Sequence, residues 1–278
     1  MVKIITDSSS EFLAAQQQKY GVSVLPMPIN FENQTYLSGV DITDEEFYAK
    51  LARAQTLPTT SMVNAYTFKK AFEEEVAKGN DVVAIVISSE LSVTYSQAVM
   101  ASQEVDANKI FVVDSKNAAL GQCALVVEAA RLRDEGLSAR EIFDRLNVLK
   151  EKIRLHAMID TLKYLRAGGR LSGKAAVVGT LLHVKPILAV EEGKVLNKGK
   201  AIGKLNAYRY IIDCFKKDCA DLTKPFILAH GCNEKAANEF EELLIKETHV
   251  TITERVYVGA TIGTHTGPGA IAIAYFVK

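Results

Sequence analysis

Apolar runs alternate with amphipathic stretches in the first half of the chain, a pattern that predicts strands separated by helices. Residues 81–88 (DVVAIVIS) and 109–115 (KIFVVDS) are almost continuously apolar, as expected of strands covered on both faces. Residues 2–6 form a third strand candidate, and the prolines in 22–31 favour a place at a sheet edge. We therefore expect residues 1–155 to form an α/β domain with a mainly parallel sheet flanked by helices.

Capping signals mark several of the intervening helices. Thr43 with Glu46, and Ser138 with Glu141, have the spacing of a capping box at a helix N-terminus. A further helix is expected to end at Gly79.

The second half has a different order of elements. Residues 154–160 predict a strand, and 184–199 predict two strands joined by a tight turn at Glu192-Gly193. Helices are expected near 201–218 and 234–247, and further strands at 226–231, 251–259 and 269–276. This pattern predicts a second α/β domain, residues 156–278, with a mixed sheet. Because we find no repeat and no long linker, we expect a large domain interface, a frequent location of ligand sites.

Composition narrows the function classes. The 278 residues include 33 Lys plus Arg and 33 Asp plus Glu, so a broad nucleic-acid or anionic-membrane surface is not expected. The four cysteines form no C-x-x-C pair and are expected to be reduced thiols. No leader pattern and no stretch of ~20 apolar residues is found, so we expect a cytoplasmic protein without an integral membrane segment.

Three hydroxyl-rich loops are candidates for ligand binding: residues 7–10, 59–61 and 88–94. Loops from strands to helices in a parallel sheet lie at its carboxyl edge, where helix N-termini and hydroxyls suit an anion such as a carboxylate or phosphate. The alternative is that each Ser or Thr only caps its helix. Two such loops together with a histidine segment favour a binding site.

That histidine, His265, lies between Thr264 and Thr266 in GATIGTHTGPG, residues 259–269, which we expect to be a glycine loop before a buried strand. Glycines allow a close backbone approach to a ligand, and the imidazole can donate a hydrogen bond to a carboxylate. The alternative is a purely structural histidine.

Residues 168–175, GGRLSGKA, approach the pattern of a phosphate-binding loop. Ala175 stands where that motif needs Ser or Thr for magnesium, and a helix, not a strand, is expected before it, so we reject nucleotide binding here. Arg166, Arg170 and Lys174 remain as an anion clamp, a docking surface for a partner, or a solvated basic loop.

Catalytic and metal sites are weakly supported. The five histidines lack metal-ligand spacing, so no metal is expected. A triad of Ser92 or Ser89, His265 and Asp114 or Asp7 is conceivable, but no G-x-S-x-G elbow is present. Many hydroxyls without a clear base and orienting acid favour binding over catalysis.

The chain resembles the DegV family over nearly its whole length. The resemblance rests on seven segments: ITDSSSEF, TTS at 59–61, SSELSVTYSQA, VVDSKNAALGQ, YLRAGGRLSGKAA, LLHVKPIL and IGTHTGPGAIAIAYF. It implies two α/β domains that hold a long-chain fatty acid at their junction, with no cofactor. It also implies a carrier, not an enzyme, which presents the carboxyl group to a separate ATP-dependent fatty acid kinase for acyl phosphate formation.

The resemblance also implies a set of carboxylate-binding residues. Thr60, Ser61 and Ser92 would hold the carboxylate, Ser92 together with the N–H of Val93, and His265 would complete the network. The expected set is Thr60, Ser61, Ser92, Val93, Thr94, Thr264, His265 and Thr266, with Arg170 balancing charge or meeting the kinase.

Some positions depart from the family pattern. Met62 and Val63 follow the first loop, Ala119 replaces a serine, and Val93 stands where the family has glycine. A valine there is expected to narrow the carboxylate pocket or to change the acyl chain selected. The alternative functions are a stand-alone enzyme, a serine hydrolase or small-molecule phosphotransferase using Ser92 and His265, or an α/β protein whose loops only cap helices.

Overall fold

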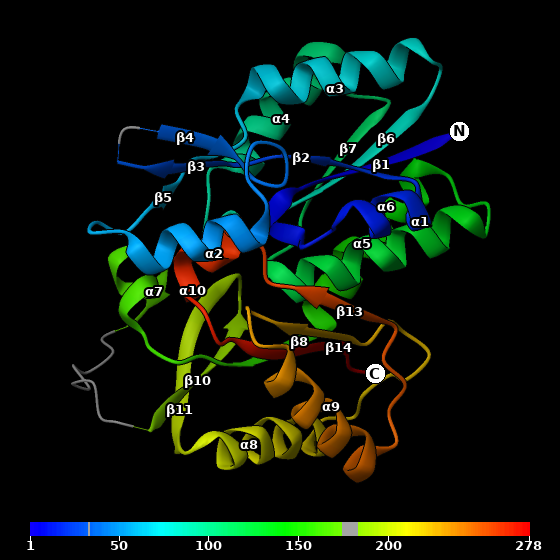
Figure 1. Cartoon of the computed structure of the whole chain (residues 1–278). Coiled ribbons are helices and arrows are strands. Elements are labelled where there is room, and N and C mark those ends of the chain that lie inside the picture. The colour runs from blue at the N-terminus through cyan, green and yellow to red at the C-terminus, as the bar shows by residue number, and fades with distance from the viewer. Residues whose placement is uncertain (33, 174–182) are drawn as a thin grey trace.

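The computed structural model describes residues 1–32, 34–173 and 183–278. They form an α/β fold with three sheets, in which the central helix α5 lies between the two larger sheets (Figure 1). No helix of the described ranges is long and apolar enough to cross a bilayer.

The first sheet is parallel, with strand order β2-β1-β6-β7. Its strands are β1 (Val2–Asp7), β2 (Val22–Leu25), β6 (Asp81–Val86) and β7 (Ile110–Asp114). Neighbouring residues Ile4 and Ile5 belong to different apolar clusters on opposite faces, because side chains alternate along a strand. The predicted parallel sheet is therefore confirmed, with both faces covered.

Helices cover this sheet as their apolar spacing predicts. Phe68 and Phe72 of α3 and Ala98 of α4 pack in the cluster on one face, and Ile142 and Leu146 of α6 pack in the cluster on the other. The capping boxes of α2 and α6 are formed as expected. The helices of this half are α1 (Ala14–Tyr20), α2 (Asp44–Arg53), α3 (Ala65–Ala77), α4 (Thr94–Val105), α5 (Ala119–Asp134) and α6 (Ala139–Leu149), with short 3-10 turns at Ser8–Ser10 and Lys150–Lys152.

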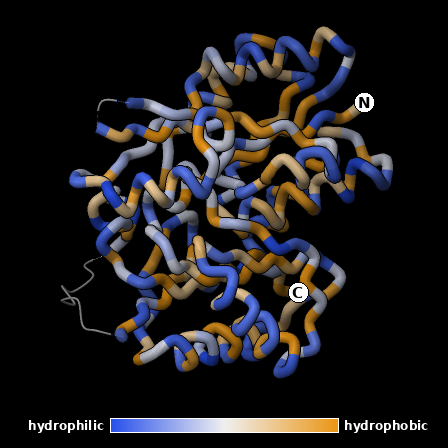
Figure 2. The backbone as a smooth tube through the Cα atoms, in the orientation of Figure 1, coloured by the Kyte–Doolittle hydropathy of each residue, from blue (hydrophilic) through white to orange (hydrophobic). Residues whose placement is uncertain are grey.

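The second sheet is mixed, with order β13-β12-β14-β8-β10-β11-β9. Its strands are β8 (Ile153–Met158), β9 (Leu171–Ser172), β10 (Val184–Glu191), β11 (Lys194–Ile202), β12 (Ile227–His230), β13 (Glu254–Tyr257) and β14 (Ile271–Phe276). The predicted tight turn joins β10 and β11 at Glu192 and Gly193. Helices α8 (Lys204–Lys217) and α9 (Glu234–Thr248) pack on its outer face, and in Figure 2 these peripheral helices alternate between hydrophilic and hydrophobic residues.

Helix α5 joins the two halves. It is buried along almost its whole length, and it contacts β1 and β6 of the parallel sheet as well as β8, β12 and β14 of the mixed one. A helix that is buried on every side belongs in an interior, and the apolar residues of this one merge the cores of both halves into one cluster. Strand β8 begins at Ile153, so we propose that the division of the chain, expected after residue 155, falls just before this strand.

A third sheet was missed by the sequence analysis. Run 22–31 does not form one strand: β2 ends at Leu25, and β3 (Pro28–Phe31) is the central strand of a small antiparallel sheet with β4 (Gln34–Leu37) and β5 (Thr59–Thr60). Pro28 is tolerated because it is the first residue of its strand. Thr59 and Thr60 are therefore in a strand, and the amide of Ser61 donates to the carbonyl of Pro28 at 2.9 Å.

The expected glycine loop around His265 is also wrong. Residues Ala260–Thr266 form helix α10, with His265 in its last turn. Glycine disfavours helices, but packing overrides that preference here. A Cβ at Gly263 would lie only 2.8 Å from Tyr48 Oη and 2.9 Å from Phe47 Cε1, so glycine allows α2 to pack directly on α10.

Candidate functional site

A cavity lies between the parallel sheet, the mixed sheet and α10. It is lined from one half of the chain by Met27, Thr60–Met62, Ile87, Leu91, Ser92 and Ala118–Leu120, and from the other by residues of β8, β10, β11, β14, α7 (Lys163–Ala167), α10 and their flanking loops. The centre of a water molecule can reach about 120 Å³ of it, whereas one water needs only ~10–15 Å³ by this measure. The cavity is thus large enough for a ligand made of several bonded groups, and not only for a single water molecule.

Most of the lining is aliphatic. On the inner face of the mixed sheet, Ala157 pairs with Ala272 on one side and with Leu188 on the other. The small alanine side chains leave space above the sheet, and Leu155 and Leu120 enclose it. This part of the cavity suits a hydrocarbon chain, since it offers burial without polar partners.

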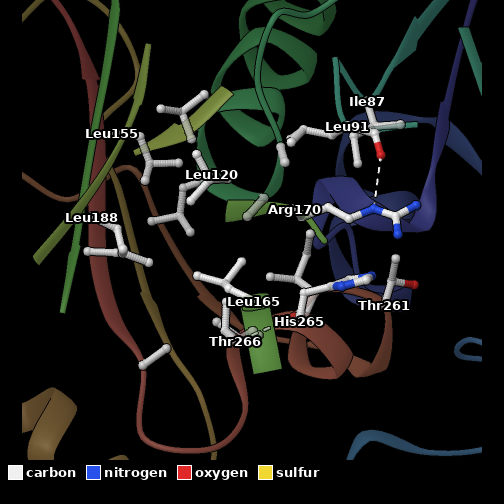
Figure 3. Close-up of a pocket in the computed structure, with 18 of the residues that line it drawn as sticks. Ile87, Leu91, Leu120, Leu155, Leu165, Arg170, Leu188, Thr261, His265 and Thr266 are labelled. Carbon is white, nitrogen blue, oxygen red and sulfur yellow. Dashed lines mark hydrogen bonds between the residues drawn. The ribbon is translucent and has the colours of Figure 1, made fainter. Parts of the chain in front are cut away.

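The polar side chains gather at the opposite end. Figure 3 shows Arg170, His265 and Thr261 together on one side, and Leu120, Leu155 and Leu188 on the other. The polar lining residues are Thr60, Ser61, Ser92, Arg170, Thr261, His265 and Thr266. A ligand that fits this division has an anionic or polar head and an apolar tail.

His265 and Thr60 are in direct contact. The Nε2 atom of His265 lies 2.8 Å from Oγ1 of Thr60, while its buried Nδ1 has no hydrogen-bond partner among the described residues. Burial and the nearby positive charge of Arg170 lower the pKa of His265 to about 4. The imidazole is therefore neutral near pH 7 and can take part in hydrogen bonds without adding charge.

Arg170 supplies the positive charge of this end. Its Nε donates to the carbonyl of Leu91 at 3.3 Å and its Nη1 to the carbonyl of Gly168 at 2.5 Å, so the backbone orients the guanidinium. Within the described ranges no carboxylate pairs with it. A guanidinium without a carboxylate partner beside an apolar cavity is suited to an anion, and the anion clamp stays a prediction.

Thr261 was missed by the sequence analysis. Its hydroxyl lies 2.8 Å from that of Ser8, which also accepts a hydrogen bond from the amide of Met27. Thr261 and His265 are four residues apart, a spacing that places both on one side of a helix. Treating this segment as a loop hid that signal.

The serine loop contributes in part. Ser92 lines the cavity, and its Oγ is 2.9 Å from Oγ1 of the buried Thr94. From the 59–61 segment, Ser61 also lines the cavity, at an exposed position. Val93 is not a lining residue: its side chain is 57% exposed and its φ of −73° is ordinary for any residue. The side chain of Val93 therefore does not narrow the cavity as it stands in this structure, and its effect on ligand choice stays a prediction.

The two threonines beside His265 mainly serve their own helix. The hydroxyl of Thr264 donates to the carbonyl of Ala260, and that of Thr266 to the carbonyls of Ile262 and Gly267. Thr264 does not line the cavity, whereas Thr266 does. Neither hydroxyl is hydrogen-bonded to the imidazole of His265.

The first hydroxyl-rich loop is a structural network. Buried Asp7 accepts hydrogen bonds from the amides of Ser9 and Ile87, and the side chains of Ser9 and Gln122 also donate to it. Burial nevertheless raises the pKa of Asp7. These groups satisfy one another, and none of residues 7–10 lines the cavity; Ser8 is linked to it through the lining residue Thr261.

The hydrolase triad is not assembled in the described part of the chain. Ser92 bonds Thr94, not His265, while the hydroxyl of Ser89 donates to Asp114 at 2.6 Å. No acid orients His265, and the described residues contain no cluster of three or more His, Cys, Asp or Glu suited to a metal.

Of the remaining basic candidates, Arg166 lies on α7 and does not line the cavity, and Lys174 lies outside the described residues.

Comparisons with known proteins give the family that this chain matches. The family model described as an uncharacterised protein of the DegV family matches residues 1–278. A DegV domain-containing protein of Caldanaerobacter subterraneus is 38% identical over 278 residues, covering 100% of this chain and 99% of that protein.

Two solved structures share the fold. One, described as DegV, a fatty acid binding protein from Bacillus subtilis, has a TM-score of 0.84 and 31% identity. The other, described as fatty acid binding of a DegV family protein from Thermus thermophilus, has a TM-score of 0.89 and 28% identity. Each comparison covers 100% of this chain and 99% of the other.

Proposed function

The chain belongs to the DegV family, and on that premise we propose that it binds a long-chain fatty acid, with the carboxylate at the polar end of the cavity and the acyl chain along its aliphatic part. The observation that carries this proposal is that one cavity has two different ends. Hydroxyl groups, an imidazole and a guanidinium line one end, and alanine and leucine side chains line the other. Solved relatives described as fatty acid binding support it.

The energetics suit such a ligand. Each methylene removed from water contributes roughly 0.8 kcal/mol, so the acyl chain supplies most of the binding free energy. A carboxylate buried without partners would oppose binding, and the hydroxyl of Thr60 and the guanidinium of Arg170 offset that cost.

We further propose that the protein is a carrier that presents the carboxyl group to a separate ATP-dependent fatty acid kinase, which forms the acyl phosphate. The family resemblance supports this role, and the exposed position of Ser61 leaves the head-group end near the surface. The carrier function itself needs no cofactor.

Mass spectrometry tests the proposal directly. The purified protein is measured under native conditions, then denatured and extracted with solvent. We expect one fatty acid per chain, released on denaturation and restored by added fatty acid. An empty protein that takes up no added fatty acid would contradict the proposal, whereas turnover of an ester that is lost in Ser92→Ala would favour the hydrolase.

A further inference from the structure

Two carboxylates from the N-terminal half hold the start of α10. Oε2 of Glu11 accepts a hydrogen bond from the amide of Gly259 at 2.7 Å, and Oδ1 of Asp44 accepts one from the amide of Ala260 at 3.0 Å. Gly259 is the N-cap residue of α10 and Ala260 is its first residue, so both acids meet the positive end of the helix. Glu11 has a φ of 61°, a conformation that few side chains other than Asn and Asp adopt, so tertiary contacts hold it in place.

Gly259 is needed for the close approach of these two acids. Its φ of −76° and ψ of −178° are ordinary for any residue, so the backbone itself does not require glycine here. A Cβ on Gly259 would instead lie 3.0 Å from Oε2 of Glu11 and 3.0 Å from Oδ1 of Asp44. The two carboxylates therefore come within about 6 Å of each other, a distance at which one negative charge disfavours ionisation of the other group.

The surroundings do not compensate two negative charges. Glu11 is only 2% exposed, and its Oε1 is buried without a hydrogen-bond partner among the described residues. The titratable side chains that act on the pair are acidic or neutral: Glu45, Tyr48, Cys123 and Tyr257. Burial and the charge of Asp44 raise the pKa of Glu11 well above its usual value, and burial raises the pKa of Asp44. Such a pair favours retention of a proton.

We infer that Glu11 and Asp44 hold one proton between them at neutral pH and are positioning residues for α10. While the proton is present, both acids stay on the first turn of the helix and hold it against the N-terminal half. Loss of the proton to water at higher pH leaves two negative charges that repel each other, and the first turn is released. For its ligand this inference rests on the proposed function: α10 carries Thr261 and His265, so release should weaken fatty acid binding.

Carbon-13 NMR of the side-chain carboxyl groups tests the shared proton without any ligand. The signals are assigned by their loss in Glu11→Gln and Asp44→Asn. We expect one protonated carboxyl in the pair at pH 7, and a lower titration midpoint of Glu11 in Asp44→Asn, because the neighbouring charge is removed. Glu45→Gln, which removes an exposed charge from the same helix, is the control and should leave the midpoint almost unchanged. Two ionised carboxyls at pH 7, or the same midpoint in Asp44→Asn as in the wild type, would overturn the inference.

Amide hydrogen exchange tests the hold on α10. The amides of Gly263 and Gly267 donate to carbonyls within this segment, to Gly259 and Gly263 respectively, so their protection reports on the helix. Between about pH 6 and about pH 9 we expect their protection factors to fall by about tenfold in the wild type. They should stay constant in Glu11→Gln, which keeps an acceptor for Gly259 but cannot ionise. Equal declines in the two proteins would contradict the proposed release.

Affinity for palmitate over the same pH range connects the acid pair to the ligand. Titration of palmitate itself is common to all variants, so the difference between proteins is what counts. We expect affinity to fall about tenfold more in the wild type than in Glu11→Gln as the pH rises. Parallel profiles would show that the pair does not position α10 for the ligand. If wild-type protein binds no fatty acid, the proposed function fails while the NMR and exchange results stand.

Discussion

The hydroxyl of Thr60 and the imidazole of His265 lie 2.8 Å apart although 205 positions separate them in the chain. Thr60 belongs to the short strand β5 and His265 to the last turn of α10. Their contact joins elements from the two halves of the chain at the polar end of the cavity, so the proposed head-group site exists only when the two halves are packed together.

Removal of the Thr60 hydroxyl should weaken fatty acid binding. Thr60→Val keeps the shape of the side chain but removes a hydrogen bond to a charged group, worth about 1.5–3 kcal/mol, so we expect a loss of about 10- to 100-fold in affinity. Isothermal titration measures it. Thr59→Val, at the exposed neighbouring position, is the matched control and should bind normally. Equal affinities of the two variants would remove Thr60 from the site.

Filling the cavity should shorten the acyl chain that fits. In Ala157→Leu the added side chain enters the space beside Ala272 and Leu188. Each methylene that is no longer accommodated forfeits about 0.8 kcal/mol, roughly a fourfold loss in affinity. Affinities for saturated acids of increasing length measure the effect. Met158→Leu, on the other face of β8, is the control. A loss that is independent of chain length would place the acyl chain elsewhere.

His265 should make the protein less stable as the pH falls. Its folded-state pKa of about 4 is below the unfolded value near 6.5, so between these values the unfolded chain binds more protons and stability decreases with decreasing pH. Urea unfolding should show this loss, about 2–3 kcal/mol between pH 6.5 and 4, in the wild type but not in His265→Gln. Other titrating groups are common to both proteins. Parallel pH profiles would contradict the assignment.

Glu11 should affect the pH dependence of stability in the opposite direction from His265. It is buried, it accepts a hydrogen bond from the amide of Gly259 at 2.7 Å, and burial raises its pKa well above the usual value. Its folded form therefore binds more protons than its unfolded form, so its contribution to stability is lost as the pH rises toward the raised pKa. Nearby Asp44, whose pKa burial also raises, accepts from Ala260 at 3.0 Å.

Two variants of Glu11 separate its charge from its hydrogen bond. Glu11→Gln keeps an acceptor for Gly259 and cannot ionise, so unfolding measurements should show a smaller decline in stability than in the wild type as the pH rises above the usual carboxyl value of 4.5. Glu11→Ala leaves that buried amide unpaired and should cost about 1–3 kcal/mol at all pH values. If Glu11→Gln were as unstable as Glu11→Ala, the acceptor would not be what matters.

Val93 should prove unimportant for ligand choice. Its side chain is 57% exposed and does not line the cavity. We expect Val93→Gly, which restores the residue of the family pattern, to change affinity by less than about twofold, because the position precedes α4 and tolerates glycine as an N-cap. A large gain in affinity or a changed chain preference would show that the valine does act on the pocket.

Local patterns in the sequence were sufficient for most of the regular elements. The apolar strands β6 and β7, the capping boxes at Thr43 and Ser138, and the turn at Glu192 form as predicted. These features depend on contacts within a few residues and on burial of whole faces, which the order of apolar and polar residues records directly. The family resemblance pointed to Thr60, Ser92 and His265 by their motifs.

Tertiary packing alone decided the rest. Helix α10 forms in a glycine-rich segment because Phe47 and Tyr48 pack on Gly263, a contact that no local propensity contains. The same packing brings Thr261 into the site and turns the hydroxyl of Thr264 back onto its own helix. The apolar part of the cavity was unreadable because its alanines and leucines have the composition of any core. Only the pairing of distant strands determines which of them border space and which fill it.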